Sequence, residues 1–370
     1  MMLGVSAEQE ELRASVSRFL ADRAPLTRVR ELMDDGETDW TVWEQAGSQL
    51  GLQGLAIPEA LGGSGFSFAE QAIVLEEFGA ALYGGPYLAS AVLAATALLA
   101  SPDEGARRGL LPDIASGETV ATLAFTEDGG AWDPGAIRLS AVKDNEAWRL
   151  DGHKSFVLDG ATAGLILVVA ATDAGLSLFA VEASAPGLGR AALPALDQTR
   201  QLARLEFAGV TGRLIGSPGD GAAVLDRALD VAAIALAAEQ LGGAQRALDM
   251  AVEYAKIRRQ FDRPIGSFQA IKHRCADLLL EVESLRSAVG YAAAAVAEDS
   301  PEIPVLASLV KAYASETYFH VAAENIQIHG GIGFTWEHDA HLYFKRAKAS
   351  ELFLGDGAYH RERLATRIGL

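Results

Sequence analysis

Two stretches in the last third of the chain carry residue types that bind phosphates and nucleotides. The first is Arg258-Arg-Gln-Phe-Asp-Arg263, which gathers three arginines in a protein of formal net charge −18. A guanidinium offers phosphate oxygens a planar pair of donors, and Phe261 beside it is placed to stack on a base or to pack into the core. The alternative reading is a helix end, which also favours cations.

The second stretch is Gln327-Ile-His-Gly-Gly-Ile-Gly333, with three glycines in four positions. Glycines let backbone N–H groups approach a ligand closely, and the Gln327 amide suits a ribose or an adenine edge. Alone, the glycines are equally typical of a helix C-cap. Together, the two stretches indicate a nucleotide site built between helices.

The elements that must position these stretches are helical. Residues 6 to about 115 carry apolar residues at helical spacing, with Ser6 as a capping residue and a helix over 40–50. Short β-prone runs separated by Gly, Asp and Pro fill 118–222, including a hairpin turn at Asp144–Asn145 flanked by Lys143 and Glu146. Four long helices are predicted over 222–259, 271–298, 304–329 and 339–354. We therefore expect an α+β multidomain fold, with an N-terminal helical domain (1–117), a central antiparallel β domain (118–222) and a C-terminal four-helix bundle (223–370).

Composition narrows the class of partner. A charge of −18 argues against nucleic acid and anionic membranes, which both require a basic face. The single cysteine, Cys275, excludes an internal disulfide. No signal peptide is visible at the start and the apolar run 88–100 is too short to span a bilayer, so a cytoplasmic protein is expected. His338 and His341 have no third firm ligand, and no metal site is predicted.

The chain resembles the FAD-dependent acyl-CoA dehydrogenase family over nearly its whole length. The stretch Gly51-Leu-Gln-Gly-Leu-Ala-Ile-Pro-Glu-Ala-Leu-Gly-Gly-Ser-Gly-Phe66 resembles the family's N-terminal signature. Residues 258–261 through Phe268-Gln269, and 327–334, resemble its two most specific C-terminal motifs. The family's order of helical, strand-rich and helical domains is also the order predicted here.

The resemblance implies roles for individual residues. The ADP part of FAD, in a neighbouring subunit, would be held by Arg258, Phe261, Gln269, Gln327, Gly330 and Gly331. The flavin ring bound to the chain itself would be lined by Phe125, Thr126, Phe156 and Val157. The second set departs from the family pattern, because Asp128-Gly-Gly-Ala-Trp-Asp133 lacks the family's serine, and Phe156 and Leu158 replace a tryptophan and a threonine. The chain's own half of the flavin site is therefore weakened.

The resemblance also calls for a carboxylate that removes the α-proton of the substrate while hydride goes to the flavin. The family's usual glutamate position aligns with Leu354, and its alternative position with Ala232. Two acids are left as candidates. Glu239 lies seven residues after Ala232 on the same predicted helix face, although an arginine partner would explain it as well. Asp356 lies two residues beyond Leu354, although a helix cap or a contact to a ribityl hydroxyl would explain it as well.

The implied activity is FAD-dependent α,β-dehydrogenation of an acyl-CoA thioester in fatty-acid or steroid side-chain β-oxidation, with electrons passed to an electron-transfer flavoprotein. The implied assembly is a dimer of dimers. The departures favour a mixed α2β2 enzyme in which a related subunit supplies flavin contacts. Two alternatives stay open: a non-catalytic subunit that completes the FAD site of its neighbour, and an oxidase of the same fold.

Overall fold

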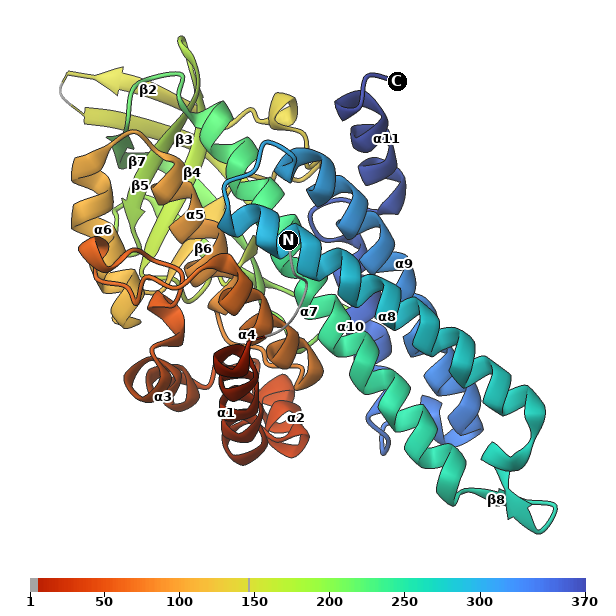
Figure 1. The fold of residues 1–370 in the computed structure, drawn as a ribbon. Helices are drawn as coiled ribbons and strands as arrows, with labels where there is room; N and C mark the ends of the chain where they lie inside the picture. The colour runs from red at the N-terminus through yellow and green to blue at the C-terminus, as the bar shows by residue number, and fades with distance from the viewer. Residues whose placement is uncertain (1–5, 146) are drawn as a thin grey trace. The chain divides into compact units, whose positions relative to one another are not determined.

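The computed structural model describes residues 6–145 and 147–370 (Figure 1). Its contacts divide the chain into two compact units. One comprises residues up to 34, 68–83 and 233–370, and is called the bundle unit below. The other comprises residues 35–67 and 84–232, and is called the sheet unit. In the part of the chain that is described, no helix has the length and apolar character needed to cross a membrane.

The sheet unit has a seven-stranded sheet with spatial order β1-β4-β2-β3-β7-β5, and β6 pairs with β7. The strands are β1 Ala121–Ala124, β2 Ser140–Asp144, β3 Ala147–Leu158, β4 Leu165–Thr172, β5 Gly175–Glu182, β6 Leu188–Leu193 and β7 Leu202–Ile215. Most pairings are antiparallel, as predicted, but β4 pairs in parallel with both β1 and β2. Alternate buried residues, among them Val168, Phe179 and Leu205, fill its core.

The turn between β2 and β3 lies where the sequence predicted a hairpin. Asp144 pairs with Ala147, and Asn145 has a φ of 57°, the left-handed conformation that asparagine tolerates. Glu146 lies outside the described residues. Further along β3 the pairing with β7 shifts register between Lys154 and Val157. This bulge bends the strand at Ser155 and Phe156.

Short helices complete the sheet unit. They are α3 Trp40–Leu50, η1 Leu52–Gly54, η2 Glu59–Leu61, a π-helical stretch η3 Leu88–Ala94, α5 Ala95–Ala100, α6 Glu104–Ser116 and η4 Pro134–Ala136. The apolar run over 88–100 thus forms two helical segments, of which the first has the wider turns of a π-helix. Ser90 in the π-helical stretch accepts a hydrogen bond from the backbone N–H of Ala121, which ties it to β1 (3.0 Å).

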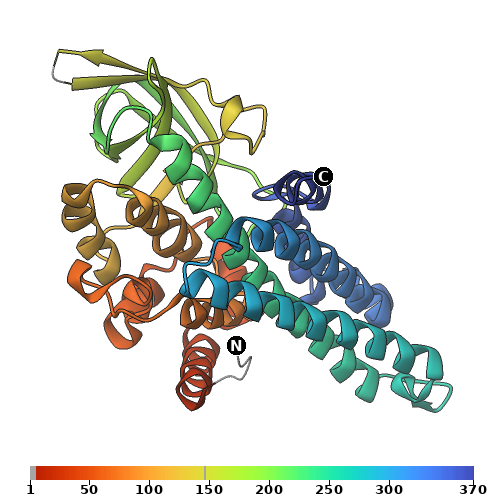
Figure 2. The same cartoon turned by 45° about the horizontal axis from the view of Figure 1, so that its top comes forward.

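The bundle unit is helical except for one small hairpin. Its helices are α1 Ala7–Arg23, α2 Leu26–Asp35, α4 Phe68–Ala80, the main part of α7 Gly221–Ile257, α8 Gln269–Ala297, α9 Ile303–His329, α10 Ala340–Leu352 and α11 Gly357–Arg367, with η6 Gly330–Phe334 after α9. The helices α8 and α9 lie side by side in both views (Figures 1 and 2). Ser6 caps α1 as predicted, in a reciprocal pair with Gln9.

Glycines allow α4 and α7 to cross at very short range. A Cβ added at Gly79 would lie 1.8 Å from the carbonyl oxygen of Glu239, and one added at Gly242 would lie 1.7 Å from that of Glu76. Neither position can take a larger side chain without moving a backbone. The crossing therefore fixes the position of Glu239 on α7.

Candidate functional site

The nucleotide residues predicted in the bundle unit are mostly exposed. The side chains of Arg258, Gln269 and Gln327 make no hydrogen bond or ion pair with any described residue, and the Phe261 ring is 86% exposed. A Cβ added at Gly330 or Gly331 would have no heavy atom within 4 Å. These residues thus leave donors, a ring and open backbone available to another molecule.

A tight hairpin presents Phe261. The strands β8 Arg259–Gln260 and β9 Arg263–Pro264 pair across Phe261 and Asp262, whose φ values are 52° and 61°. Two left-handed residues in a two-residue loop define a type I′ turn. The helix predicted over 222–259 ends at Ile257, and the helix predicted from 271 begins at Gln269, with Phe268 at its N-cap.

The flavin residues predicted in the sheet unit are largely bonded to the protein itself. The Thr126 hydroxyl donates to the carbonyl oxygen of Ser155 (2.6 Å), and the Ser155 N–H donates to the carbonyl oxygen of Thr126 (2.9 Å). Phe125 and Val157 are buried, whereas Phe156 lies on the bulge with a φ of 58° and is 37% exposed. Thr126 therefore joins the segment after β1 to β3 through two hydrogen bonds.

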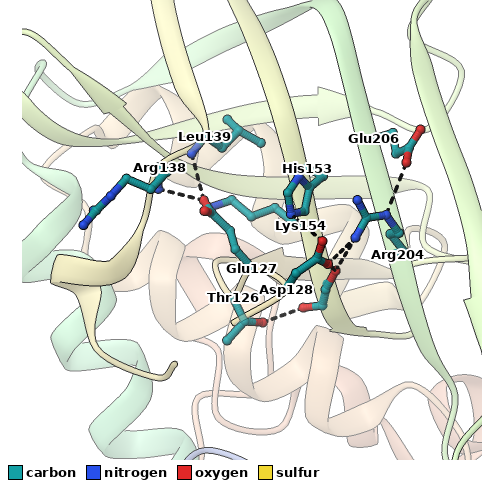
Figure 3. Close-up of polar contacts among 10 residues, drawn as sticks. Thr126, Glu127, Asp128, Arg138, Leu139, His153, Lys154, Arg204 and Glu206 are labelled. Carbon is teal, nitrogen blue, oxygen red and sulfur yellow. Dashed lines mark hydrogen bonds and ion pairs between the residues drawn. The ribbon is translucent and has the colours of Figure 1, made fainter. Parts of the chain in front are cut away.

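Asp128 contacts three other side chains in this region, which no pattern in the sequence predicted. Its carboxylate accepts hydrogen bonds from the Ser155 hydroxyl and the Arg204 guanidinium, and pairs with Nε2 of His153 at 3.0 Å (Figure 3). The Ser155 hydrogen bond and the two basic neighbours hold the pKa of Asp128 below its usual range. Asp128 and Arg204 are 76 positions apart, so no local pattern predicts their contact.

A second pair missed from the sequence lies beside it. The Lys154 ammonium is fully buried and donates to the Phe125 carbonyl oxygen and to Oε1 of Glu127, each at 3.0 Å. Burial lowers the pKa of Lys154 to about 8, against the opposing effect of Glu127. Burial alone would raise the pKa of Glu127, but hydrogen bonds from the N–H groups of Leu139 and Arg138, with the Lys154 charge, lower it. Glu127 thus holds the loop after β1 to β2 and β3.

The first candidate base, Glu239, has a buried partner. Its Oε1 accepts a hydrogen bond from Nη1 of Arg346 on α10 at 2.8 Å, and the two residues are 7% and 1% exposed. An arginine partner was the alternative explanation for an acid on this apolar helix face. The contact favours a structural role, because the guanidinium takes up an oxygen that a base would present to a substrate.

The second candidate, Asp356, caps a helix. Its Oδ1 accepts from the N–H of Tyr359 (2.8 Å) at the start of α11. Leu354, just before it, is buried at a φ of 62°. The carbonyl oxygen of Leu354 bonds Nε2 of His360 (3.0 Å), and that of Gly355 accepts from the fully buried Lys311 ammonium (3.0 Å). The turn is thus held from two sides, with leucine where the family pattern puts glutamate.

The histidines considered for a metal lie among aromatic rings. The His341 ring meets Trp336 edge-on at 4.8 Å, and the His338 ring lies 4.3 Å from that of His329. No three His, Cys, Asp or Glu side chains converge on a metal position anywhere in residues 6–145 and 147–370.

Comparisons with known proteins cover nearly the whole chain. Three family models match in order: the acyl-CoA dehydrogenase N-terminal domain at residues 6–118, the middle domain at 122–210 and the C-terminal domain at 219–369. The chain is 38% identical over 362 residues to acyl-CoA dehydrogenase IpdE2 of Mycobacterium tuberculosis, which covers 98% of this chain and 97% of that protein.

Two solved assemblies are similar in fold and sequence. The ChsE4–ChsE5 complex from Mycobacterium tuberculosis matches with a TM-score of 0.90 and 32% identity, over 100% of this chain and 99% of that one. The Tcur3481–Tcur3483 steroid ACAD, solved as a variant, matches with a TM-score of 0.89 and 33% identity, over 99% and 98% of the two chains.

Proposed function

The chain belongs to the acyl-CoA dehydrogenase family and is an oxidoreductase of that kind, and we propose that it works as one subunit of a mixed, FAD-dependent assembly. In this assembly it offers its bundle unit to the ADP part of FAD on a related subunit. Bound FAD supplies the hydride acceptor for α,β-dehydrogenation of an acyl-CoA thioester. Electrons then pass to an electron-transfer flavoprotein.

The observation that carries the proposal is the contrast between the two sets of flavin residues. In the bundle unit, Arg258, Gln269 and Gln327 make no polar side-chain contact with any described part of the chain, which suits groups that bind a diphosphate and a ribose. In the sheet unit, Thr126 and Ser155 are bonded to each other through both backbone and side chain. The first set is open to a ligand, whereas the Thr126 hydroxyl and carbonyl oxygen of the second set are bonded within the chain.

A steroid thioester is the favoured substrate, ahead of a straight-chain fatty acyl group. The support is the likeness to the Tcur3481–Tcur3483 steroid ACAD at 33% identity. The α-proton needs a base. Because Glu239 bonds Arg346 and Asp356 caps α11, we assign that step to a carboxylate of the related subunit, and keep Glu239 and Asp356 as residues to be tested.

The test is the flavin content of the chain alone and of the chain co-expressed with related acyl-CoA dehydrogenase chains from the same genome. We expect colourless protein alone, and a yellow, active complex with fewer than one FAD per chain. A yellow and active homotetramer would rule out the mixed assembly. Within the complex, Arg258→Ala should lower FAD retention, while Arg274→Ala on α8, whose guanidinium pairs with Glu324 at 2.8 Å, should not.

A non-catalytic role is the second candidate, favoured by leucine at position 354. For this candidate, as for the first proposal, the complex should turn over at unchanged kcat with Glu239→Gln and with Asp356→Asn in this chain. Loss of kcat in either variant, with FAD retained, would assign the base to this chain.

A further inference from the structure

Two histidine rings lie against each other at the turn that joins α9 to α10, and the proposed function gives neither of them a role. His329, the last residue of α9, stacks on Tyr254 of α7 with ring centres 4.2 Å apart. The centre of the His338 ring lies 4.3 Å from that of His329. We propose that this pair is an acid-sensitive latch, which holds residues 330–339 in place while both rings are neutral and releases them when the rings gain protons.

The hydrogen bonding of His338 requires a neutral ring. Its Nδ1 accepts from the backbone N–H of Ala340, the first residue of α10, at 3.1 Å. A ring nitrogen that accepts a hydrogen bond carries no proton, so protonation of Nδ1 breaks this contact. The new charge would also lie at the N-terminus of α10, where the helix dipole disfavours cations. Proton uptake by His338 therefore loosens the start of α10.

His329 is buried and is held in one tautomer by its own helix. The residue is 6% exposed, and its Nδ1 donates to the carbonyl oxygen of Asn325 at 2.8 Å. A carbonyl oxygen only accepts, so Nδ1 carries the proton of the neutral ring and a further proton must go to Nε2. That second proton makes the ring a buried cation. Because the His338 ring is so close, a charge on both rings is destabilising.

Arg30 of α2 adds a fixed positive charge to the same segment. Its Nη1 and Nη2 donate to the carbonyl oxygens of Trp336 (2.8 Å) and His338 (3.1 Å). Its Nε donates to Oδ1 of Asp339 at 2.8 Å, so the acid next to His338 in the chain is already paired. Arg30 therefore holds residues 336–339 while the rings are neutral, and repels His338 once that ring is charged.

The first turns of α10 add a lysine and a third histidine. Nζ of Lys345 lies 4.1 Å from the centre of the Trp336 ring, and His341 meets that ring edge-on. Burial lowers the pKa of all three histidines below the usual 6.5, and nearby positive groups lower it further against the opposing effect of Asp339 or of a backbone hydrogen bond. The ordered segment thus binds fewer protons than the released one, and its stability is lost as the pH falls below about 6.5.

Release of the segment would change the nucleotide-binding edge of the bundle unit. Gly330 and Gly331 follow His329 directly in the chain, so the position of that residue sets where their backbone lies. For this consequence the inference rests on the proposed function, and it adds a regulation of the same site, because acid would weaken the hold on the ADP part of FAD. The latch itself needs no nucleotide and can be tested on the chain alone.

Hydrogen–deuterium exchange of the full chain at pH 7.5 and 5.5, corrected for the intrinsic exchange rate, measures the release. One histidine that charges only in the released segment raises the open fraction about 10-fold over this range. We therefore expect peptides that cover 330–345 to lose protection about 10-fold or more at pH 5.5, while peptides of α8 keep theirs.

Two variants remove the proton sites and keep the contacts. His338→Asn has an oxygen that can accept from the N–H of Ala340 but takes up no proton, so its response to acid should be weaker. His329→Phe keeps a ring against Tyr254 without a proton site, and should weaken the response in the same way. The matched control is His320→Asn on α9, where the side chain is 51% exposed, and its response should equal that of the unsubstituted chain.

The outcomes that overturn the inference are distinct from those that concern the proposed function. Equal protection of 330–345 at both pH values overturns the latch, as does an undiminished response in both His338→Asn and His329→Phe. An equal loss of protection in α8 also overturns it, because acid would then open the whole bundle unit.

The consequence for the nucleotide is tested in the complex. FAD retention should fall between pH 7.5 and 5.5, and should fall less with His338→Asn. Equal retention at both pH values, with the segment released, would overturn the link between the latch and the nucleotide-binding edge. A complex that holds no FAD at either pH refutes the proposed function, while the exchange experiment still decides on the latch.

Discussion

The Glu239–Arg346 pair gives the most direct test of how the bundle unit is built. Glu239→Ala removes the acid and leaves a guanidinium on a residue that is 1% exposed. Breaking a buried ion pair from one side costs about 3–5 kcal/mol, because the remaining charge is still out of water. At roughly 2–4 °C per kcal/mol for domains of 150–250 residues, the melting temperature should fall by about 10 °C.

Three variants make the prediction specific. Glu239→Gln keeps an oxygen that accepts from Arg346, so its loss in the free energy of unfolding should be smaller than that of Glu239→Ala. The double variant Glu239→Leu with Arg346→Met removes both charges and should recover most of the loss. Glu253→Ala on the same helix is the control, since that side chain is 64% exposed and 3.8 Å from Arg246, and should cost less than about 0.5 kcal/mol.

Urea unfolding and differential scanning calorimetry measure the stability changes, and turnover of the complex is measured alongside. A loss below about 1 kcal/mol in Glu239→Ala would refute the structural reading, because removing the carboxylate partner of a buried guanidinium should cost more than that. Near-normal stability of Glu239→Gln with turnover lowered by orders of magnitude would do the same, and would make Glu239 the base.

Three further predictions concern buried lysines and a helix crossing. For Lys154, the folded pKa of about 8 lies below its ordinary 10.5, so the unfolded chain binds more protons and stability should rise by about 1.5 kcal/mol from pH 8 to 9.5; denaturation across this range measures it. Gly79→Ala would bring a Cβ to 1.8 Å from the Glu239 carbonyl oxygen and should cost about 3 kcal/mol or more in calorimetry. Lys311→Met, which leaves the carbonyl oxygens of Glu351 and Gly355 without their donor, should cost about 2–3 kcal/mol in urea unfolding.

Each of these three predictions has a control variant or an outcome that would contradict it. Lys154→Met should abolish the rise with pH, and a rise that persists in that variant would belong to another group. Gly290→Ala on α8 has open space around the new methyl group and should be neutral or stabilising. If it costs as much as Gly79→Ala, close packing is not the cause. Lys311→Arg keeps the charge but adds bulk. Equal stability of Lys311→Met and the unsubstituted chain would show that Lys311 does not stabilise the turn at Leu354–Gly355.

Local sequence patterns predicted the bounds of several helices well, but they did not predict strand β6 or the turn at Phe261–Asp262. The helix over 40–50 and the end of α9 at His329 lie where apolar spacing put them, because both are bounded by residues that act locally. The strand β6 has mostly exposed residues and no apolar alternation, so it forms through its pairing with β7. The turn at Phe261–Asp262 has no glycine or asparagine, which are the usual signals for its conformation.

The candidate site shows the same difference between residues that local patterns predict and residues that only distant contacts bring together. Contiguous motifs were enough to predict the nucleotide residues of the bundle unit, since Arg258 and Gln327 each lie in a short stretch that can be interpreted without the rest of the chain. The arginine partners of Asp128 and Glu239 lie 76 and 107 positions away in the sequence. Only the folded chain brings them together. An acid on an apolar helix face indicated a special role for Glu239, but could not tell a buried partner from a substrate.

The two buried lysines also allow the opening of each unit to be followed by chemical labelling. Lys154 belongs to the sheet unit and Lys311 to the bundle unit, and both are 0% exposed. An amine-reactive reagent can modify either one only after its unit opens. Pulse labelling followed by peptide mass spectrometry would therefore time the opening of the two units separately, without any introduced probe. Adding a partner chain should slow labelling of whichever unit it covers.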